Sequence, residues 1–115
     1  MEDCIFCKIS KGEIPSEKIY ENENFFSIFN VQPKADGHAL VISKKHFETI
    51  LDMPASLGSE LIDCIKKTVL KVLDKTKAEG FNLVQNNFDV AGQTVKHSHV
   101  HILPRKKGDN SPYVY

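Results

Sequence analysis

The stretch Val95–Leu103 reads Val-Lys-His-Ser-His-Val-His-Ile-Leu and places three of the chain's five histidines at alternate positions. Successive side chains of an extended strand point to opposite faces, so this spacing predicts that His97, His99 and His101 share one face. A single histidine in a strand is usually a hydrogen-bonded polar residue and no more. Three titratable rings on one face would each bear the cost of desolvation, which favours a functional site.

The sequence around this stretch predicts a small mixed fold. Apolar, β-branched and aromatic runs predict four further strands, at residues 18–21, 25–29, 38–42 and 81–85. The unbroken apolar run at 38–42 favours a central strand covered on both faces. Apolar residues then recur at helical spacing from Leu57 to Leu73, which predicts an amphipathic helix of roughly six turns with Ser56 as N-cap and Gly80 at its end. Pro104 is expected to close the histidine strand.

Length and composition exclude several classes of protein. The 115 residues predict a single domain, residues 1–115, with a short tail from about residue 105. Fifteen basic residues balance fifteen acidic ones, and they form no stripe that could follow a nucleic-acid duplex. No signal peptide and no stretch long enough to span a bilayer is visible. We therefore expect a cytoplasmic protein that binds neither duplex nucleic acid nor membrane.

A close pair of cysteines, Cys4 and Cys7, lies near the start of the chain. A two-residue gap lets both thiolates face one zinc ion, and Lys8 and Lys11 favour their deprotonation. A pair without chemical function is an equally good interpretation, and a redox role ranks lower because no strand can precede the pair. Cys64 adjoins the apolar stripe of the predicted helix, where a free cysteine is expected to pack as a small apolar residue.

The histidine stretch suits chemistry at phosphorus. A neutral imidazole is a competent nucleophile when an acceptor holds its other nitrogen and neighbouring donors neutralise the phosphate. His99 has the middle position between His97 and His101, and Gln93 and Thr94 precede the stretch, where they can hydrogen-bond a ligand. Residues 90–103 contain no carboxylate that would repel a phosphate, whereas a zinc hydrolase is expected to carry one as base or orienting group.

Residues 92–103 resemble the signature of the histidine-triad nucleotide-binding superfamily, in which histidines alternate with apolar residues. Residues 4–9, 37–46 and 83–87 resemble further segments of that family in the same order, so the similarity spans nearly the whole chain. The resemblance implies an α+β fold with a five-stranded antiparallel sheet, one long helix and one short helix. It also implies a homodimer that binds a purine nucleotide and cleaves a bond at the α-phosphorus.

The same resemblance assigns roles to individual residues. It implies that His99 becomes transiently nucleotidylated, with His38, His97 and His101 in support. The residues that it places at the nucleoside, the phosphate or the leaving group are Ile28, Asn30, Val31, Asn86, Gln93 and Thr94. The zinc-bearing branch of the family implies that Cys4, Cys7, His46 and His97 hold a structural Zn²⁺. Four such ligands close a tetrahedral site and leave no open position for catalysis.

Two positions depart from the family pattern. Asn30 stands where members commonly carry an aspartate that accepts from the ribose hydroxyls, and an amide brings no charge to that contact. Ser98 stands where the family usually has an apolar residue, on the face opposite the histidines. Asn30 therefore bears on ribose affinity or base preference, and Ser98 bears on packing.

Three hypotheses of function follow. The first is a hydrolase or nucleotidyl transferase that acts on purine nucleotide conjugates, such as phosphoramidates or dinucleoside polyphosphates, through a covalent His99 intermediate. The second is a nucleotide-binding adaptor or regulatory protein in which hydrolysis is vestigial. The third, a zinc protein that uses the three histidines themselves as its metal site, rests only on the number of ligands.

Overall fold

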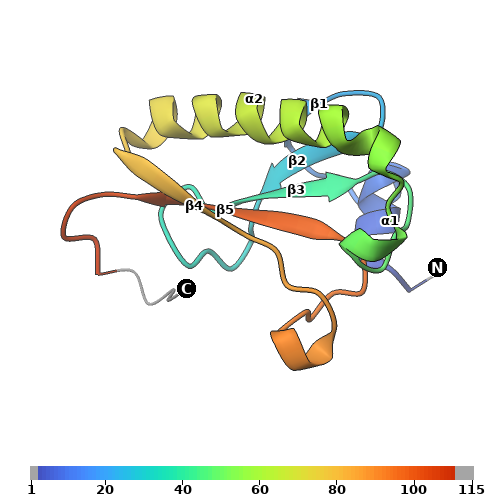
Figure 1. The fold of residues 1–115 in the computed structure, drawn as a ribbon. Helices are drawn as coiled ribbons and strands as arrows, with labels where there is room; N and C mark the ends of the chain where they lie inside the picture. Colours follow the sequence, from blue (N-terminus) through green and yellow to red (C-terminus); the bar gives the residue numbers. More distant parts are fainter. Residues whose placement is uncertain (1–2, 111–115) are drawn as a thin grey trace.

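A five-stranded antiparallel sheet forms the centre of the molecule, and the long helix α2 lies across one of its faces (Figure 1). The computed structural model describes residues 3–110. The strands follow the spatial order β1-β2-β3-β5-β4. Their bounds are Lys18–Glu21 for β1, Phe25–Phe29 for β2, Ala39–Ser43 for β3, Gly80–Val84 for β4 and His99–Arg105 for β5. The two α-helices are α1, Ile5–Ser10, and α2, Gly58–Thr76; single 3-10 turns span Ile50–Asp52, Ala55–Leu57 and Asp89–Ala91. The predicted fold class is thus confirmed.

The two faces of the sheet are buried by different elements, because side chains alternate along β2 and β3. Phe25, Ala39 and Val41 belong to the core under α2. Phe26, Ile28, Leu40 and Ile42 instead pack with Phe6 and Ile9 of α1 on the other face. Every residue of β3 is buried, which confirms the predicted central strand covered on both faces. Within the described residues, neither helix is long and apolar enough to cross a bilayer.

The register of β5 against β3 sets the positions of two histidines. Ile42 lies opposite His99, and Leu40 lies opposite His101. Because these leucine and isoleucine side chains face α1, both rings emerge on the α1 side of the sheet rather than under α2. The candidate site is therefore on the face that the short helix covers only in part.

Helix α2 is shorter than predicted. Residues 55–57 form a 3-10 turn, so Ser56 is not the N-cap, and no side chain caps the helix start at Leu57. The helix ends at Thr76, and Lys77 takes the left-handed conformation that was expected nearer Gly80. The hydroxyl of Thr76 bonds the carbonyl of Val72 and accepts from the amide of Ala78. The predicted stripe faces the core except at Ile62, which is exposed, and Cys64 is fully buried beside it.

The predicted histidine strand is displaced toward the C-terminus. Residues 95–98 lie outside regular structure, β5 begins at His99, and the strand continues through Pro104 to Arg105. Pro104 has no amide hydrogen, but the pairing of β3 with β5 stops at Ile102, so no β3 partner is lost there. On the other edge of β5, Pro104 lies opposite Phe81 of β4. The tail therefore begins after Arg105, and its residues 111–115 lie outside the described residues.

Candidate active site and metal centre

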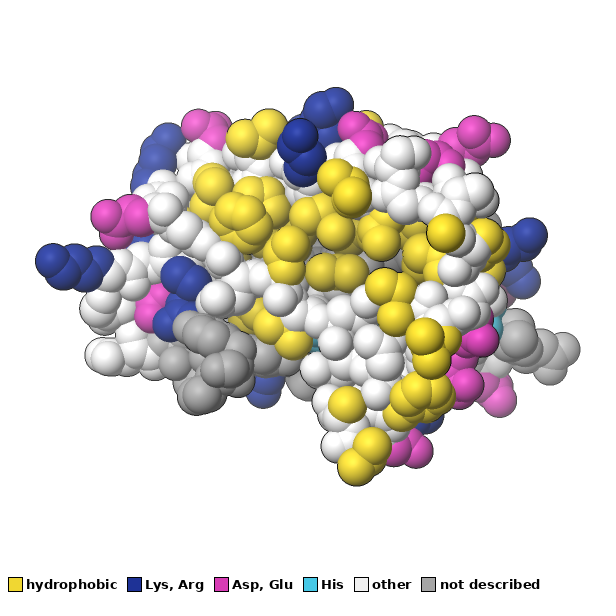
Figure 2. Space-filling model, in the orientation of Figure 1, with side chains coloured by type: hydrophobic (Ala, Val, Ile, Leu, Met, Phe, Trp, Pro, Cys, Tyr) yellow, Lys and Arg dark blue, Asp and Glu magenta, His cyan; other side chains and the backbone are white. Residues whose placement is uncertain are grey.

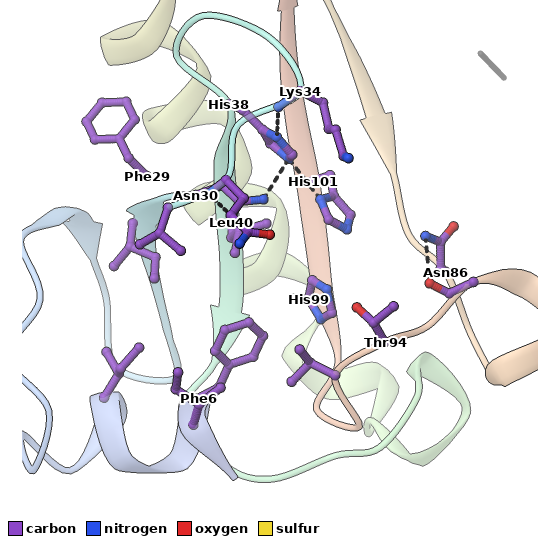
Figure 3. A pocket seen from close by; sticks show the side chains of 17 residues that line it. Phe6, Phe29, Asn30, Lys34, His38, Leu40, Asn86, Thr94, His99 and His101 are labelled. Carbon is purple, nitrogen blue, oxygen red and sulfur yellow. Dashed lines mark hydrogen bonds between the residues drawn. The ribbon is translucent and has the colours of Figure 1, made fainter. Parts of the chain in front are cut away.

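A cavity of about 480 Å³ opens on the α1 side of the sheet (Figure 3). One part of its wall is apolar and comes from α1 and strands β2 and β3. The apolar lining comprises Ile5, Phe6, Ile9, Ile28, Phe29, Val31, Leu40 and, from the loop before β5, Val95. The polar lining comprises Asn30, Gln32, Lys34, His38, Asn86, Thr94, His99 and His101. The volume lies within the ordinary range of small-molecule sites, roughly 300–1,000 Å³.

His99 is held in one tautomer by the backbone. Its Nδ1 lies 2.7 Å from the carbonyl oxygen of His97, which can only accept, so Nδ1 carries the hydrogen and donates. The lone pair is therefore on Nε2. Burial lowers the pKa of His99, which keeps the ring neutral at neutral pH. The ring of Phe6 packs edge-on against it, with centroids 5.1 Å apart.

His38 and His101 form a directed pair. The backbone amide of Lys34 donates to His38 Nδ1 over 3.0 Å, so the hydrogen of His38 is on Nε2. That Nε2 lies 2.9 Å from His101 Nδ1 and donates to it, which leaves the hydrogen of His101 on its own Nε2. Burial, followed by the charges of their neighbours, lowers the pKa of both rings to about 4. His101 therefore offers an N–H donor close to the lone pair of His99; the two ring centroids are 5.0 Å apart.

A second cluster joins Cys4, Cys7, His46 and His97, whose ligand atoms lie within 4.8 Å of one another. Cys4 caps the start of α1, Cys7 lies inside that helix, and the two histidines follow β3 and precede β5. Nδ1 of His97 is 3.2 Å from the sulfur of Cys4 and 3.5 Å from that of Cys7, and Nδ1 of His46 is 3.3 Å from Cys7. Ligands bound to one tetrahedral Zn²⁺ stand about 3.3–3.8 Å apart, so these residues fit a zinc ion.

The tautomer of His97 is also the one that a metal ligand requires. Its Nε2 donates to the carbonyl of Ser43 over 2.6 Å, so the Nδ1 lone pair faces the two sulfurs. Burial lowers the pKa of His97 to about 4, which favours the neutral ligand form. Burial and then the Cys4 thiol raise the pKa of the Cys7 thiol, an effect that a bound cation would reverse. The carbonyl of His97 meanwhile holds His99, so one residue links the cluster to the cavity.

The structure brings most of the predicted substrate residues together. Ile28, Asn30, Val31, Asn86 and Thr94 line the same cavity as His38, His99 and His101. His97 does not line it, because its ring is turned toward the cysteines.

Gln93 is buried, and its amide bonds within the protein. It donates to the carbonyls of Glu48 and Val95 and accepts from the amide of Phe88. Gln93 does not line the cavity. Its visible role is to hold the loop that carries Asn86 and Thr94.

The two departures from the family pattern each have a local partner. The Oδ1 of Asn30 accepts from the amide of Gln32 over 3.1 Å, and its amide nitrogen lies 3.5 Å from His38 Nε2. The hydroxyl of Ser98 is buried and accepts from the side chain of Gln85 over 2.8 Å. The polar group at position 98 is thus satisfied without an apolar cover.

Phe6 and Lys34 are among the cavity residues that sequence reasoning missed; the others are Ile5, Ile9, Phe29, Gln32, Leu40, Gly92 and Val95. Phe6 was visible only as the residue between the cysteines, and its contact with His99 needs α1 to cross the sheet. Lys34 lies in the loop before β3, and nothing local indicates that this loop closes one end of the cavity. The one sequence feature that could have pointed to Lys34 is its position four residues before His38.

Residues 11–108 match the model of the HIT domain family. The chain belongs to the HIT family. This HIT protein is 41% identical over 107 residues to Adenosine 5'-monophosphoramidase HNT1 of Candida albicans, a match that covers 90% of this chain and 70% of the relative. It is 37% identical over 107 residues to Adenylylsulfatase HINT3 of Arabidopsis thaliana, covering 93% of this chain and 54% of that longer protein. The solved structure of SMU.412c from Streptococcus mutans UA159 has a TM-score of 0.91 and 40% identity, and covers all of this chain and 73% of that one.

Proposed function

We propose that the protein is a purine nucleotide hydrolase that cleaves nucleotide conjugates at the α-phosphorus through a nucleotidyl-His99 intermediate. The observation that carries the proposal is the pair of fixed tautomers in the cavity. His99 offers a lone pair on Nε2 because its Nδ1–H is bound to the backbone, and His101 offers an N–H because His38 donates to its other nitrogen. A nucleophile beside a donor for a phosphoryl oxygen is the pair that such a displacement requires.

The reaction proceeds in two displacements. The Nε2 lone pair of His99 attacks phosphorus, the bond to the leaving group breaks with its electron pair on that group, and a P–N bond to His99 forms. The N–H of His101 binds a phosphoryl oxygen as charge develops there. Water then attacks phosphorus and gives up a proton to solvent, and the P–N bond breaks with its electron pair returning to Nε2 of His99. The nucleoside monophosphate leaves, and His99 is neutral again.

The apolar end of the cavity is the proposed nucleoside site. Ile28, Leu40 and Phe6 give a purine ring apolar cover, and Asn30 stands at the edge with Val31. Asn30 is the proposed ribose contact, through an amide without charge. Asn86 and Thr94 face this end from across the histidines, and they are the proposed contacts of the phosphate or the leaving group (Figure 3). Gln93 is proposed to act through the loop that it holds.

Cys4, Cys7, His46 and His97 are the proposed ligands of one Zn²⁺. When bound, the ion supplies a cross-link between α1, the segment after β3 and the bend before β5, with no open coordination position. His97 then keeps its carbonyl oxygen in place for His99 Nδ1. This assignment gives His97 to the metal and leaves His99 and His101 for the reaction. It therefore disfavours a metal site built from the three histidines alone.

The relatives' names support a nucleotide conjugate as substrate. One is named for a phosphoramidate of adenosine monophosphate and the other for an adenylyl sulfate, and in both the adenylyl group is bound to a leaving group. The test is turnover of adenosine 5'-phosphoramidate by the wild type and by His99→Ala. We expect the substitution to reduce kcat by at least a thousand-fold, with circular dichroism unchanged. Full activity of His99→Ala would refute the mechanism. Slow turnover by the wild type in a single-turnover assay, with tight product binding by calorimetry, would favour the adaptor hypothesis.

A second copy of the chain is the proposed partner. Apolar side chains form a broad band across the face shown in Figure 2, where Figure 1 places α2 and β4. Phe81 and Leu83 of the edge strand β4 are 42% and 48% exposed, and Ile62 and Leu70 of α2 are also exposed. An apolar edge strand is a hazard unless it is covered, and a two-fold dimer covers it on both copies. Sedimentation velocity should show a dimer for the wild type and a monomer for Leu83→Lys, with Val90→Lys as an exposed control; a monomeric wild type would refute the assignment.

A further inference from the structure

Lys34 is the one lysine or arginine among the described residues that line the cavity, and no aspartate or glutamate lines it. The residue lies in the loop between β2 and β3. Its backbone amide binds His38, while its side chain extends beside the pair of His38 and His101 (Figure 3). Because the histidines are buried and neutral, the Lys34 ammonium is the permanent positive charge of this wall. The catalytic steps above do not use it.

The ammonium stands at a defined end of the row of histidines. The ring of His101 lies 5.0 Å from that of His99, and the ring of His38 lies 5.1 Å from that of His101 on the other side. The backbone amide of Lys34 binds His38, at the end of the row farthest from His99, and the side chain of Lys34 extends beside His101 (Figure 3). Figure 3 shows the same order, with His99, His101 and Lys34 in succession.

This order has a consequence for a displacement at phosphorus. The attacking and leaving atoms stand roughly in line, so the leaving group lies on the far side of phosphorus from His99. Lys34 lines the same cavity beyond His101, so a leaving group that departs away from His99 toward that end of the row meets the ammonium (Figure 3). The nucleoside occupies the apolar wall near Phe6 and Leu40 and does not compete for this end.

We propose that Lys34 is the specificity residue for the leaving group, and that it favours conjugates whose leaving group is an oxyanion, a sulfate or a phosphate, over conjugates of an amine. The inference rests on the proposed hydrolase function and names its preferred substrate class. It also assigns a role to the Lys34 ammonium, which takes no part in the displacement by His99.

The chemistry of the two bonds explains the preference. When His99 attacks a mixed anhydride, the P–O bond breaks with its electron pair on oxygen, and sulfate or phosphate leaves without taking a proton. Negative charge thus grows on the leaving oxygen, where an ammonium in a partly buried site stabilises it. When the P–N bond of a phosphoramidate breaks, the electron pair stays on nitrogen, which takes a proton from solvent water, and the amine leaves uncharged. The Lys34 ammonium therefore does not stabilise the departure of an amine.

The kinetic test compares two substrates that share the adenylyl group. Adenosine 5'-phosphosulfate carries an oxyanion leaving group, and adenosine 5'-phosphoramidate carries an amine. We expect Lys34→Gln to lower kcat/KM for the phosphosulfate at least ten-fold and for the phosphoramidate less than three-fold. Lys34→Arg should restore most of the loss, since it keeps the charge. The substitutions leave the backbone amide that binds His38 in place.

Lys106→Gln is the matched control. It removes one positive charge from a neighbouring cavity of about 220 Å³ that Lys34 also lines, but Lys106 does not line the proposed nucleotide site. The ratio of the two kcat/KM values should stay at the wild-type value in this variant. The proposal is overturned if Lys34→Gln lowers kcat/KM equally for both substrates, or changes it for neither, because the charge would then not act on the leaving group.

A binding measurement separates this proposal from the proposed function. In a His99→Ala background, calorimetry with ADP and AMP compares ligands that differ by one phosphate at the leaving-group position. We expect ADP to bind at least ten-fold more tightly than AMP, and Lys34→Gln to reduce this ratio to less than three. A wild type that turns over neither substrate refutes the hydrolase, while the ADP preference still decides whether Lys34 forms an anion subsite. Equal affinities with Lys34 present overturn the subsite.

Discussion

At the scale of single residues, hydrogen bonds place the hydrogen of each ring in the row: backbone groups do so for His38 and His99, and the His38 side chain does so for His101. The carbonyl of His97 accepts from His99, and the amide of Lys34 donates to His38, which donates to His101. His99 therefore presents a lone pair and His101 an N–H, without a carboxylate. A chain of neutral donors suits a polyanionic ligand, since a carboxylate in the same place would repel it. His38 is the residue on which the donor role of His101 depends.

Replacement of His38 by phenylalanine tests this dependence. The variant keeps an aromatic ring of similar size but cannot donate to His101 Nδ1, so the tautomer of His101 is no longer set. We expect kcat to fall about 10- to 100-fold, the effect of one lost hydrogen bond to a developing charge, with a smaller change in KM. His38→Gln, whose amide can donate, should recover part of the activity. A kcat of His38→Phe equal to that of the wild type would contradict the assignment.

At the scale of elements, the turn into β3 depends on a glycine. Gly37 has a positive φ of 80°, and a Cβ built there would lie 2.5 Å from Cγ2 of Thr76 in the last turn of α2. The absence of a side chain therefore lets the loop that carries Lys34 pass beneath the helix end.

Gly37→Ala should lower the free energy of unfolding by about 1–3 kcal/mol, because the residue must adopt a strained φ and displace Thr76. Urea denaturation measures the change. Gly58→Ala is the matched control: its φ of −59° is helical and its Cβ meets nothing within 4 Å, so it should leave stability unchanged or raise it slightly. Equal effects of the two substitutions would show that the close approach to Thr76 does not matter.

The Cys/His cluster joins elements that the sheet alone does not join. Cys4 and Cys7 come from the cap and the first turns of α1, and the segments after β3 and before β5 contribute one histidine each. Atomic emission should find about one zinc per chain, and the metal should be lost from Cys7→Ser. We expect that variant or chelation to lower Tm, and kcat to fall with it because His99 loses the support of the His97 carbonyl. Wild-type protein without zinc, and equally stable after treatment with a chelator, would contradict the metal assignment.

At the scale of the whole molecule, the buried histidines link stability to pH. The pKa values of His38 and His101 are about 4 in the folded state and near 6.5 in the unfolded chain, so the unfolded state binds more protons between these values. Stability is therefore full above pH 6.5 and falls as the pH drops toward 4, by about 3 kcal/mol for a single ring. Urea midpoints measured from pH 7 to 4 should show this decline. In a His38→Phe, His101→Phe double variant the decline should shrink, and a decline of undiminished size would locate its source elsewhere.

Much of the fold could be predicted because its elements have strong local patterns. The strand at 25–29 coincides with β2, and the strands predicted at 38–42 and 81–85 differ from β3 and β4 by one residue. Element ends were less predictable. The end of α2 is set by the hydroxyl of Thr76 and the left-handed Lys77, neither of which is a usual helix stop. The alternation of histidines predicted one shared face, but β5 begins only at His99, and the ring of His97 is turned away to the cysteines.

The sequence by itself determined the α+β class, the family and the set of side chains from which a site could be built, because these follow from periodicity and from residue types along the chain. Only the tertiary structure decided what each of them faces. It separated His97 from His99, turned the amide of Gln93 inward and brought Phe6 and Lys34 to opposite parts of one cavity. The physical reason is that hydrogen-bond partners and buried charges arise from contacts between segments up to about ninety residues apart, such as Cys4 and His97, and no local pattern encodes them.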